Sequence, residues 1–149
     1  MLSVLDRLID EDPKHSAEAP MTRSQSLSAL KTAIRRDLEW LLNTRQPVEP
    51  PPEDAAELQQ SVYCYGLPDI CSLNLITDRE RSLLARMMES IISTFEPRLA
   101  GARITPVTTS GGNLPHIRFL IEAMLRIDPA PERISFDTVL DVSSGEYQV

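Results

Sequence analysis

The segment "HIRFLIEAMLRID" (residues 116–128) can be read as a helix or as a strand, and the fold class depends on which reading is right. Its apolar residues alternate with charged ones, and turn-forming residues stand on both sides. Strict alternation over this length is typical of a half-buried strand, so we expect a long strand. The expected core face carries Ile117, Phe119, Ile121, Ala123, Leu125 and Ile127. The other face carries Arg118, Glu122, Arg126 and Asp128, with Leu120 and Met124 among them.

Further strands are expected on both sides of this segment. "ARITPVTT" (102–109) has the period of a strand, and the glycines of "SGGN" (110–113) permit a tight turn after it. "ISFDTVLDV" (134–142) predicts another strand, and "SSGEYQV" (143–149) predicts a turn at Gly145 with a short last strand. The alternation in 134–142 is imperfect and is carried by Ile134, Phe136, Val139 and Leu140. These segments together predict an antiparallel meander of three to four strands.

A helix is expected directly ahead of the strands, at "TDRERSLLARMMESIISTF" (77–95). Thr77 and Glu80 have the spacing of a capping box at its start. Its broad apolar face is made of Leu83, Leu84, Met87, Met88, Ile91, Ile92 and Phe95. A helix packed on an antiparallel meander predicts an α+β fold, preceded by N-terminal helices.

An earlier amphipathic helix is expected at "SQSLSALKTAIRRDLEWLLNTR" (24–45), with its serines as N-caps. Its apolar stripe consists of Leu27, Leu30, Ile34, Leu38, Leu41 and Leu42. Lys31, Arg35 and Arg36 form a local basic face on the same helix. This face is either solvated or a contact surface for an acidic partner.

The remaining segments connect or precede these elements. The prolines of "QPVEPPPEDA" (46–55) predict a stiff spacer, and "SVYCYGLPDICSLNL" (61–75) predicts a loop. Tyr63, Tyr65 and Leu67 are expected to anchor that loop to the core. Leu2, Leu5, Leu8 and Ile9 share one face of a short amphipathic segment, which docks either on its own core or on a partner. The expected divisions are a docking segment (1–21), an adaptor helix (22–45), a linker (46–60) and an α+β domain (61–149).

Composition excludes several classes of function. The 149 residues carry a net charge of −7, which argues against a nucleic-acid partner. No apolar run approaches the ~18 residues of a membrane span, and the first residues do not resemble a secretory signal, so a cytoplasmic location is expected. Cys64 and Cys71 are too few for a disulfide framework, and His15 and His116 stand apart, so no metal or cofactor is expected.

The segment "STFEPRLAG" (93–101) places an acid where the helix should end. Pro97 disfavours α geometry at Glu96, so Glu96 is expected at the helix exit, where an anion is unfavourable. Arg98 lies on the same side of an extended chain. The pair is therefore either a local clasp that sets the corner or a charged site for a partner.

An enzymatic reading of Glu96 is weak. Glycoside hydrolysis needs two carboxyl groups across a cleft, and a neighbouring arginine favours the charged form of a carboxyl, unlike a general acid. Nothing in the sequence nominates a second carboxylate, for which Asp69, Asp78 and Glu122 are no more than candidates. The single tryptophan, Trp40, lies outside the expected domain. We therefore expect no catalytic residues.

Several motifs in order resemble one family. They are "SVLDRLID" (3–10), "IRRDLEWLLNTR" (34–45), "YGLPD" (65–69), "DRER" (78–81), "FEPRL" (95–99) and "RFLIEAMLRIDPAPERISFDTVLDVSSGEYQV" (118–149). Together they resemble the TssE family, the sheath initiators of the type VI secretion baseplate, which are similar to contractile-phage proteins long labelled baseplate lysozymes. The resemblance covers nearly the whole chain.

The resemblance implies a non-enzymatic structural subunit that links the baseplate wedge to the first ring of the contractile sheath. Its location would be the cytoplasmic face of the inner membrane, without membrane insertion. The implied partners are the wedge subunits TssF, TssG and TssK and the sheath subunits TssB and TssC. The implied link to the sheath is β-strand addition. The alternative is a peptidoglycan-cleaving glycoside hydrolase that uses Glu96.

The resemblance also implies three sets of partner-binding residues. Glu96, Pro97 and Arg98 would hold the wedge. The adaptor helix would bind partners through Lys31, Arg35, Arg36, Trp40 and Arg45. The sheath-facing edge would consist of Ile134, Phe136, Val139, Glu146, Tyr147 and Val149.

Overall fold

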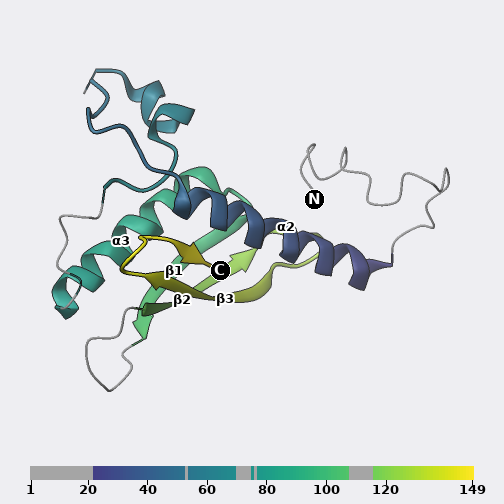
Figure 1. Ribbon diagram of the computed structural model, residues 1–149. Coiled ribbons are helices and arrows are strands. Elements are labelled where there is room, and N and C mark those ends of the chain that lie inside the picture. The colour runs from purple at the N-terminus through teal and green to yellow at the C-terminus, as the bar shows by residue number, and fades with distance from the viewer. Residues whose placement is uncertain (1–21, 53, 70–74, 76, 108–115) are drawn as a thin grey trace, which may run out of the picture.

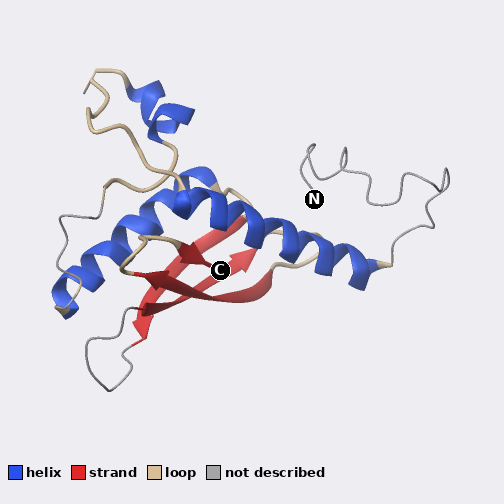
Figure 2. Ribbon diagram, in the orientation of Figure 1, coloured by secondary structure: helices blue, strands red, loops and turns tan. Residues whose placement is uncertain are grey.

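The computed structural model describes residues 22–52, 54–69, 75, 77–107 and 116–149. Two long helices pack together with one antiparallel sheet, which confirms the α+β prediction (Figures 1 and 2). The predictions for residues 1–21 (including Leu2, Leu5, Leu8, Ile9 and His15), for Cys71 and for the turn at 110–113 lie outside the described residues. The elements are α2 (Arg23–Asn43), η1 (Ala56–Gln60), η2 (Val62–Cys64), α3 (Asp78–Phe95), β1 (Leu99–Val107), β2 (His116–Leu125), β3 (Glu132–Asp141) and β4 (Tyr147–Gln148).

The segment 116–125 is the strand β2, so the alternation was interpreted correctly. Ile117, Phe119, Ile121, Ala123 and Leu125 are buried, and Ile127, just past the strand, packs partly against the core. The sheet is a meander with the strand order β1-β2-β3-β4, and β2 pairs with β3 from His116↔Asp141 to Leu125↔Glu132. The four predicted strands are therefore all present, with the last one only two residues long.

Two details of the strands differ from the prediction. β1 begins at Leu99 rather than 102, because the chain pairs with β2 almost directly after α3, through Leu99↔Leu125. A register shift between Ala100 and Arg103 interrupts this pairing. In β3, the inward position belongs to Thr138, which is 1% exposed, rather than to its neighbour Val139, which is half-buried.

Both long helices are capped by threonine. The predicted serine caps of α2 are wrong: Thr22 accepts from the Gln25 amide, and the Gln25 side chain accepts from the Thr22 amide in return. In α3, Thr77 accepts from the Glu80 amide at 3.3 Å as predicted, while the Glu80 carboxylate accepts from the Thr77 hydroxyl at 2.8 Å. These caps satisfy backbone donors that the first helical turn leaves unpaired.

The core is a single cluster to which α2, α3 and all four strands contribute. The apolar stripe of α2 supplies Leu30, Ile34, Leu38, Leu41 and Leu42, all buried. The proline-rich segment thus separates the two helices along the chain but not in their packing. The boundaries at 46–60 stay a prediction. No helix within the described residues is long and apolar enough to cross a membrane.

The loop before α3 is fixed by backbone pairing to the residues that directly follow α2. Leu67 is buried, its N–H donates to Thr44 O at 2.9 Å, and its carbonyl accepts from Gln46 N–H at 2.9 Å. Tyr65 packs edge-on against Phe95, with 5.4 Å between the ring centres. Leu67 and Tyr65 thus act as the predicted anchors, whereas Tyr63 is partly exposed and bonds the Glu49 carbonyl.

Gly66 is the residue that permits this close approach. Its φ is +102°, and a Cβ there would lie 2.4 Å from the Thr44 carbonyl oxygen. We expect Gly66→Ala to destabilise the fold by about 2 to 3 kcal/mol, because it combines backbone strain with a clash against backbone. Gly101 is the matched control, since its φ is +61° and nothing lies within 4 Å of an added Cβ. Gly101→Ala should cost only about 1 kcal/mol. Equal shifts of the denaturant midpoint in the two variants would contradict the packing argument.

Candidate functional site

Glu96 ends α3 and turns its side chain into the protein. It is the C-cap residue, with φ −120° and ψ 75°, and its N–H still donates to Ile92 O at 2.9 Å. Pro97 follows and prevents the helix from continuing. Glu96 is only 4% exposed, so a charged carboxylate here needs strong compensating donors.

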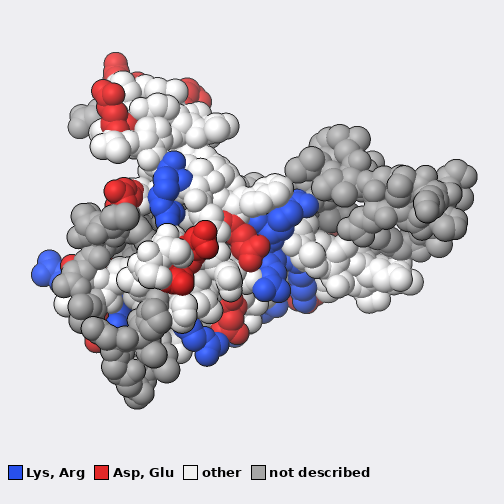
Figure 3. Space-filling view, in the orientation of Figure 1, with Lys and Arg blue, Asp and Glu red and all other residues white. Residues whose placement is uncertain are grey.

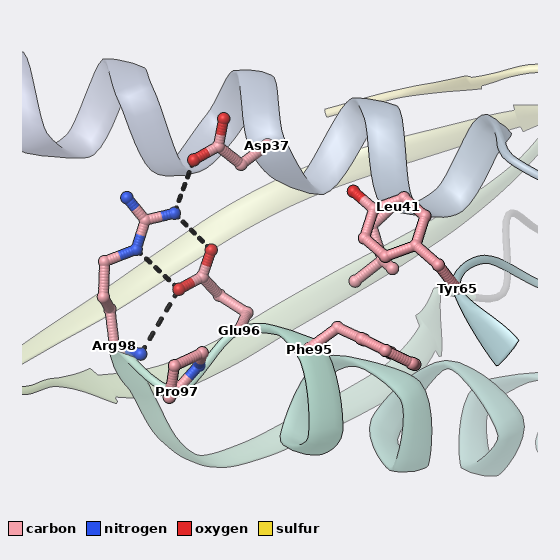
Figure 4. A pocket seen from close by; sticks show the side chains of 7 residues that line it. All are labelled: Asp37, Leu41, Tyr65, Phe95, Glu96, Pro97 and Arg98. Atoms are coloured by element: carbon pink, nitrogen blue, oxygen red, sulfur yellow. Dashed lines mark hydrogen bonds and ion pairs between the residues drawn. The ribbon is translucent and has the colours of Figure 1, made fainter. Parts of the chain in front are cut away.

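Arg98 supplies those donors. Its Nε donates to Glu96 Oε1 at 2.6 Å, its Nη2 donates to Glu96 Oε2, and its backbone N–H reaches Oε1 at 3.2 Å (Figure 4). Two parallel bonds from one guanidinium to one carboxylate are the geometry of a strong charge-assisted pair. The local clasp considered from the sequence is therefore present.

A third group, Asp37 of α2, completes the cluster. Arg98 Nη2 donates to Asp37 Oδ2 at 2.5 Å, and Arg36 donates to Asp37 Oδ1 at 2.8 Å through Nη2. One guanidinium thus joins the end of α3 to the middle of α2. Asp37 was missed from the sequence. The available signal was its position three residues after Ile34 and four before Leu41, beside the apolar stripe.

The opposite charges of this cluster stabilise one another. Hydrogen bonding to Glu96, reinforced by Asp37, raises the pKa of Arg98 despite the cost of its burial. Burial and the charges of Asp37 and Glu96 raise the pKa of Tyr65 nearby. The carboxylates of Asp37 and Glu96 thus share the guanidinium of Arg98.

A small pocket of about 260 Å³ opens beside the cluster, between α2 and the end of α3. It has an apolar wall and a charged wall, formed by Leu41, Tyr65, Phe95 and Pro97 and by Asp37, Glu96 and Arg98 (Figure 4). Arg98 Nη1 is buried and has no hydrogen-bond partner among the described residues. No group of acidic, histidine or cysteine residues in the described part of the chain could hold a metal ion.

The basic residues predicted to bind partners from the adaptor helix lie in different surroundings. Lys31 and Arg45 point to the sheet, where Lys31 Nζ bonds Glu132 Oε1 at 2.8 Å and Arg45 Nη2 bonds Gly145 O at 2.6 Å. Arg36 instead lies 4.8 Å from the ring centre of Trp40, which is 52% exposed. Acidic and basic side chains alternate over the face in Figure 3, so no single basic patch forms there.

The predicted sheath-facing residues are mostly in the core. Ile134, Tyr147 and Val149 are buried, and Phe136 packs partly against the core. Val139 is half-buried on the outer face, and Glu146 is exposed. At this edge of the sheet, only backbone groups could recruit another strand.

Side chains of α2 bond the outward backbone groups of 147–149. Asn43 exchanges two hydrogen bonds with Tyr147, at 2.8 and 2.9 Å, much as a neighbouring strand would. Glu39 accepts from Val149 N–H at 3.2 Å, and Arg35 Nε donates to Val149 O. Together with Lys31, these residues form a stripe with a four-residue spacing, which we call the edge stripe.

The opposite edge, β1, is protected in other ways. Ile104 N–H donates to Glu89 Oε1 of α3 at 2.8 Å. Pro106 has no N–H to offer, and the register shift near Gly101 bends the start of the strand. The outer backbone groups of β1 and β4 are thus protected by different means.

Comparisons with known proteins agree with this fold. The sequence profile of the family described as "Baseplate wedge protein gp25" matches residues 28–130. A solved chain from "The baseplate complex from the type VI secretion system" is similar, with a TM-score of 0.52 and 17% identity. The similarity covers 76% of this chain and 96% of that chain. At this identity the likeness establishes a shared fold. A search of curated protein sequences gave no match.

Removing the guanidinium of the cluster should destabilise the protein strongly. Arg98→Ala leaves Glu96 buried without its main donor, so we expect a loss of about 3 kcal/mol in the free energy of unfolding. Arg133→Ala is the control, because its ion pair with Glu122 is exposed and should contribute less than about 1 kcal/mol. Chemical denaturation measures both. A small effect in Arg98→Ala would mean that the cluster does not hold α2 to α3.

Proposed function

The chain belongs to the family of baseplate wedge protein gp25, and on that premise we propose that it is a structural, non-enzymatic subunit of a type VI secretion baseplate. The resemblance inferred from the sequence motifs is confirmed at the level of the family. In this proposal the chain links the wedge complex, with TssF, TssG and TssK, to the first sheath ring of TssB and TssC.

The proposed wedge contact rests on the pocket that Glu96, Pro97 and Arg98 help to line. Its apolar wall suits a hydrophobic side chain, and its charged wall suits a polar group of the same partner. The buried cluster fixes the shape of this pocket before a partner arrives, which lowers the cost of binding. Trp40 and Arg36 extend the same side of α2 and are proposed as a second contact.

The same cluster supports the non-enzymatic role. The carboxylates of Asp37 and Glu96 both bind the guanidinium of Arg98. They therefore do not face each other across a substrate cleft. Peptidoglycan cleavage through Glu96 therefore has no geometric support here.

The proposed wedge contact is tested by co-purification. Arg98→Lys keeps the positive charge but cannot form the two parallel bonds to Glu96. We expect the purified full-length variant to stay folded by circular dichroism and to bind the TssF, TssG and TssK wedge at least about tenfold more weakly. Arg118→Ala, an exposed cation on the outer face of the sheet, should bind as the unaltered protein does. A folded Arg98→Lys variant with unchanged wedge binding would refute the contact.

A further inference from the structure

Residues 47–64 leave the end of α2, project from the body of the protein and return to it (Figure 1). We call this excursion the arm, and the structure describes all of it except residue 53. The two ends of the arm are held at the same place. The side-chain nitrogen of Gln46 donates to the carbonyls of Cys64 and Gly66, each at 2.7 Å. The arm is thus a loop closed at its base, and not a spacer between two distant elements.

Hydrogen bonds inside the arm hold its shape. The hydroxyl of Tyr63 donates to the carbonyl of Glu49 at 2.9 Å, so the outgoing and returning limbs lie together. Ser61 joins η1 to η2, because its hydroxyl donates to Leu58 O at 2.8 Å and accepts from Tyr63 N–H at 3.2 Å. Ordering a loop of this length costs conformational entropy, which some other contact has to offset.

The arm buries no side chain that would offset this cost. None of its described residues is buried, and neither η1 nor η2 contributes to the core. Instead, Val48 is 97% exposed and Val62 is 88% exposed, and Leu58 and Tyr63 are also exposed. Val48 and Val62 lie in the same part of the arm, since each adjoins a residue of the bond between Tyr63 and Glu49. Exposed apolar groups gathered on one ordered element are typical of a protein interaction site.

The charge of the arm has one sign. Its acidic residues in the sequence are Glu49, Glu53, Asp54 and Glu57, and no lysine or arginine occurs between Arg45 and Arg79. The described ones, Glu49, Asp54 and Glu57, are all exposed. Figure 3 shows acidic side chains on the projecting lobe at the upper left, whereas both signs occur on the body below it. An acidic surface with exposed apolar residues complements a basic surface that has apolar pockets.

The base of the arm adjoins the pocket proposed as the wedge contact. η2 ends at Cys64, and the next residue, Tyr65, lines the pocket together with Leu41 and Phe95 (Figure 4). A partner that fills the pocket therefore lies beside the base of the arm. The arm and the pocket form one continuous surface for the same partner.

We propose that the arm docks on a basic surface of the wedge, with Val48 and Val62 in apolar pockets of that surface. The acidic side chains of the arm then face lysines and arginines of the partner. The choice of the wedge as the partner rests on the proposed function, while the arm is a contact in addition to the pocket. Because the arm is ordered before it binds, docking costs little further conformational entropy.

The apolar part of this contact is tested by a double substitution, Val48→Thr with Val62→Thr. Threonine keeps the branched shape of valine but places a hydroxyl in the apolar pockets of the partner. With the full-length protein and a purified wedge of TssF, TssG and TssK, we expect binding to weaken at least about tenfold. Val107→Thr is the matched control, since Val107 is an exposed valine at the end of β1, and it should change binding less than about twofold. The denaturant midpoint should stay unchanged, because all three valines are exposed.

The charge of the contact is tested by two charge reversals. Glu57→Lys and Glu146→Lys each replace an exposed carboxylate and change the net charge equally, but only Glu57 lies in the arm. We expect Glu57→Lys to weaken wedge binding at least about fivefold at low ionic strength, and less as salt is added. Glu146→Lys should bind as the unaltered protein does. No effect of Glu57→Lys, or an equal effect of both variants, would refute the basic surface as the partner of the arm.

Hydrogen exchange and the other partners separate the outcomes. The amides of residues 55–65 should exchange more slowly when the wedge binds. Wedge binding that the double substitution leaves unchanged, with no slowing at 55–65, would overturn the docking of the arm and leave the pocket contact standing. No wedge binding by the unaltered protein would overturn the proposed function, and the docking of the arm with it. If the double substitution instead abolished binding to purified TssB–TssC sheath subunits, or self-association, the wedge would be refuted as the partner.

Discussion

The arrangement of the helices depends on one guanidinium. Arg98 bonds the carboxylate that ends α3 and the carboxylate in the middle of α2, and its own backbone begins the path into β1. Apolar packing alone can let two helices slide against each other, because dispersion contacts are not directional. Buried charged hydrogen bonds have defined partners and geometry, and they are costly when unmatched. The cluster therefore fixes the position of α2 over α3, and with it the shape of the pocket.

The two edges of the sheet differ in how permanent their protection is. At β1, a proline and a bulge belong to the strand itself, and Glu89 of the adjoining helix adds a bond. At β4, protection comes from side chains on a helix distant in sequence.

Much of the fold could be predicted from the sequence, because the apolar residues of its helices and strands recur at regular spacing. The alternation of 116–125 and the apolar face of 77–95 each report burial on one side. Both were interpreted correctly except at Leu83, which is 48% exposed because it lies at the margin of the buried face of α3. The capping residue of α2 and the inward turn of Thr138 are local choices that periodicity does not determine. Asp37, Glu39 and Asn43 were missed because a polar residue on a helix is usually solvated, and only the partner across the fold reveals its role. The clasp of Glu96 and Arg98 could be predicted, because the two residues lie only two positions apart in the sequence.

The bonds between Asn43 and Tyr147 join residues 104 positions apart. Such contacts have high contact order, so they form only after the intervening chain has largely organised. β4 is too short to be stable on β3 alone, and α2 supplies the rest of its hydrogen bonds. The hydrogen bonds between β4 and α2 therefore form late in folding. During synthesis, the edge of β3 stays uncovered until residues 147–149 have left the ribosome, and over that interval the growing chain is most open to pairing with the wrong neighbour.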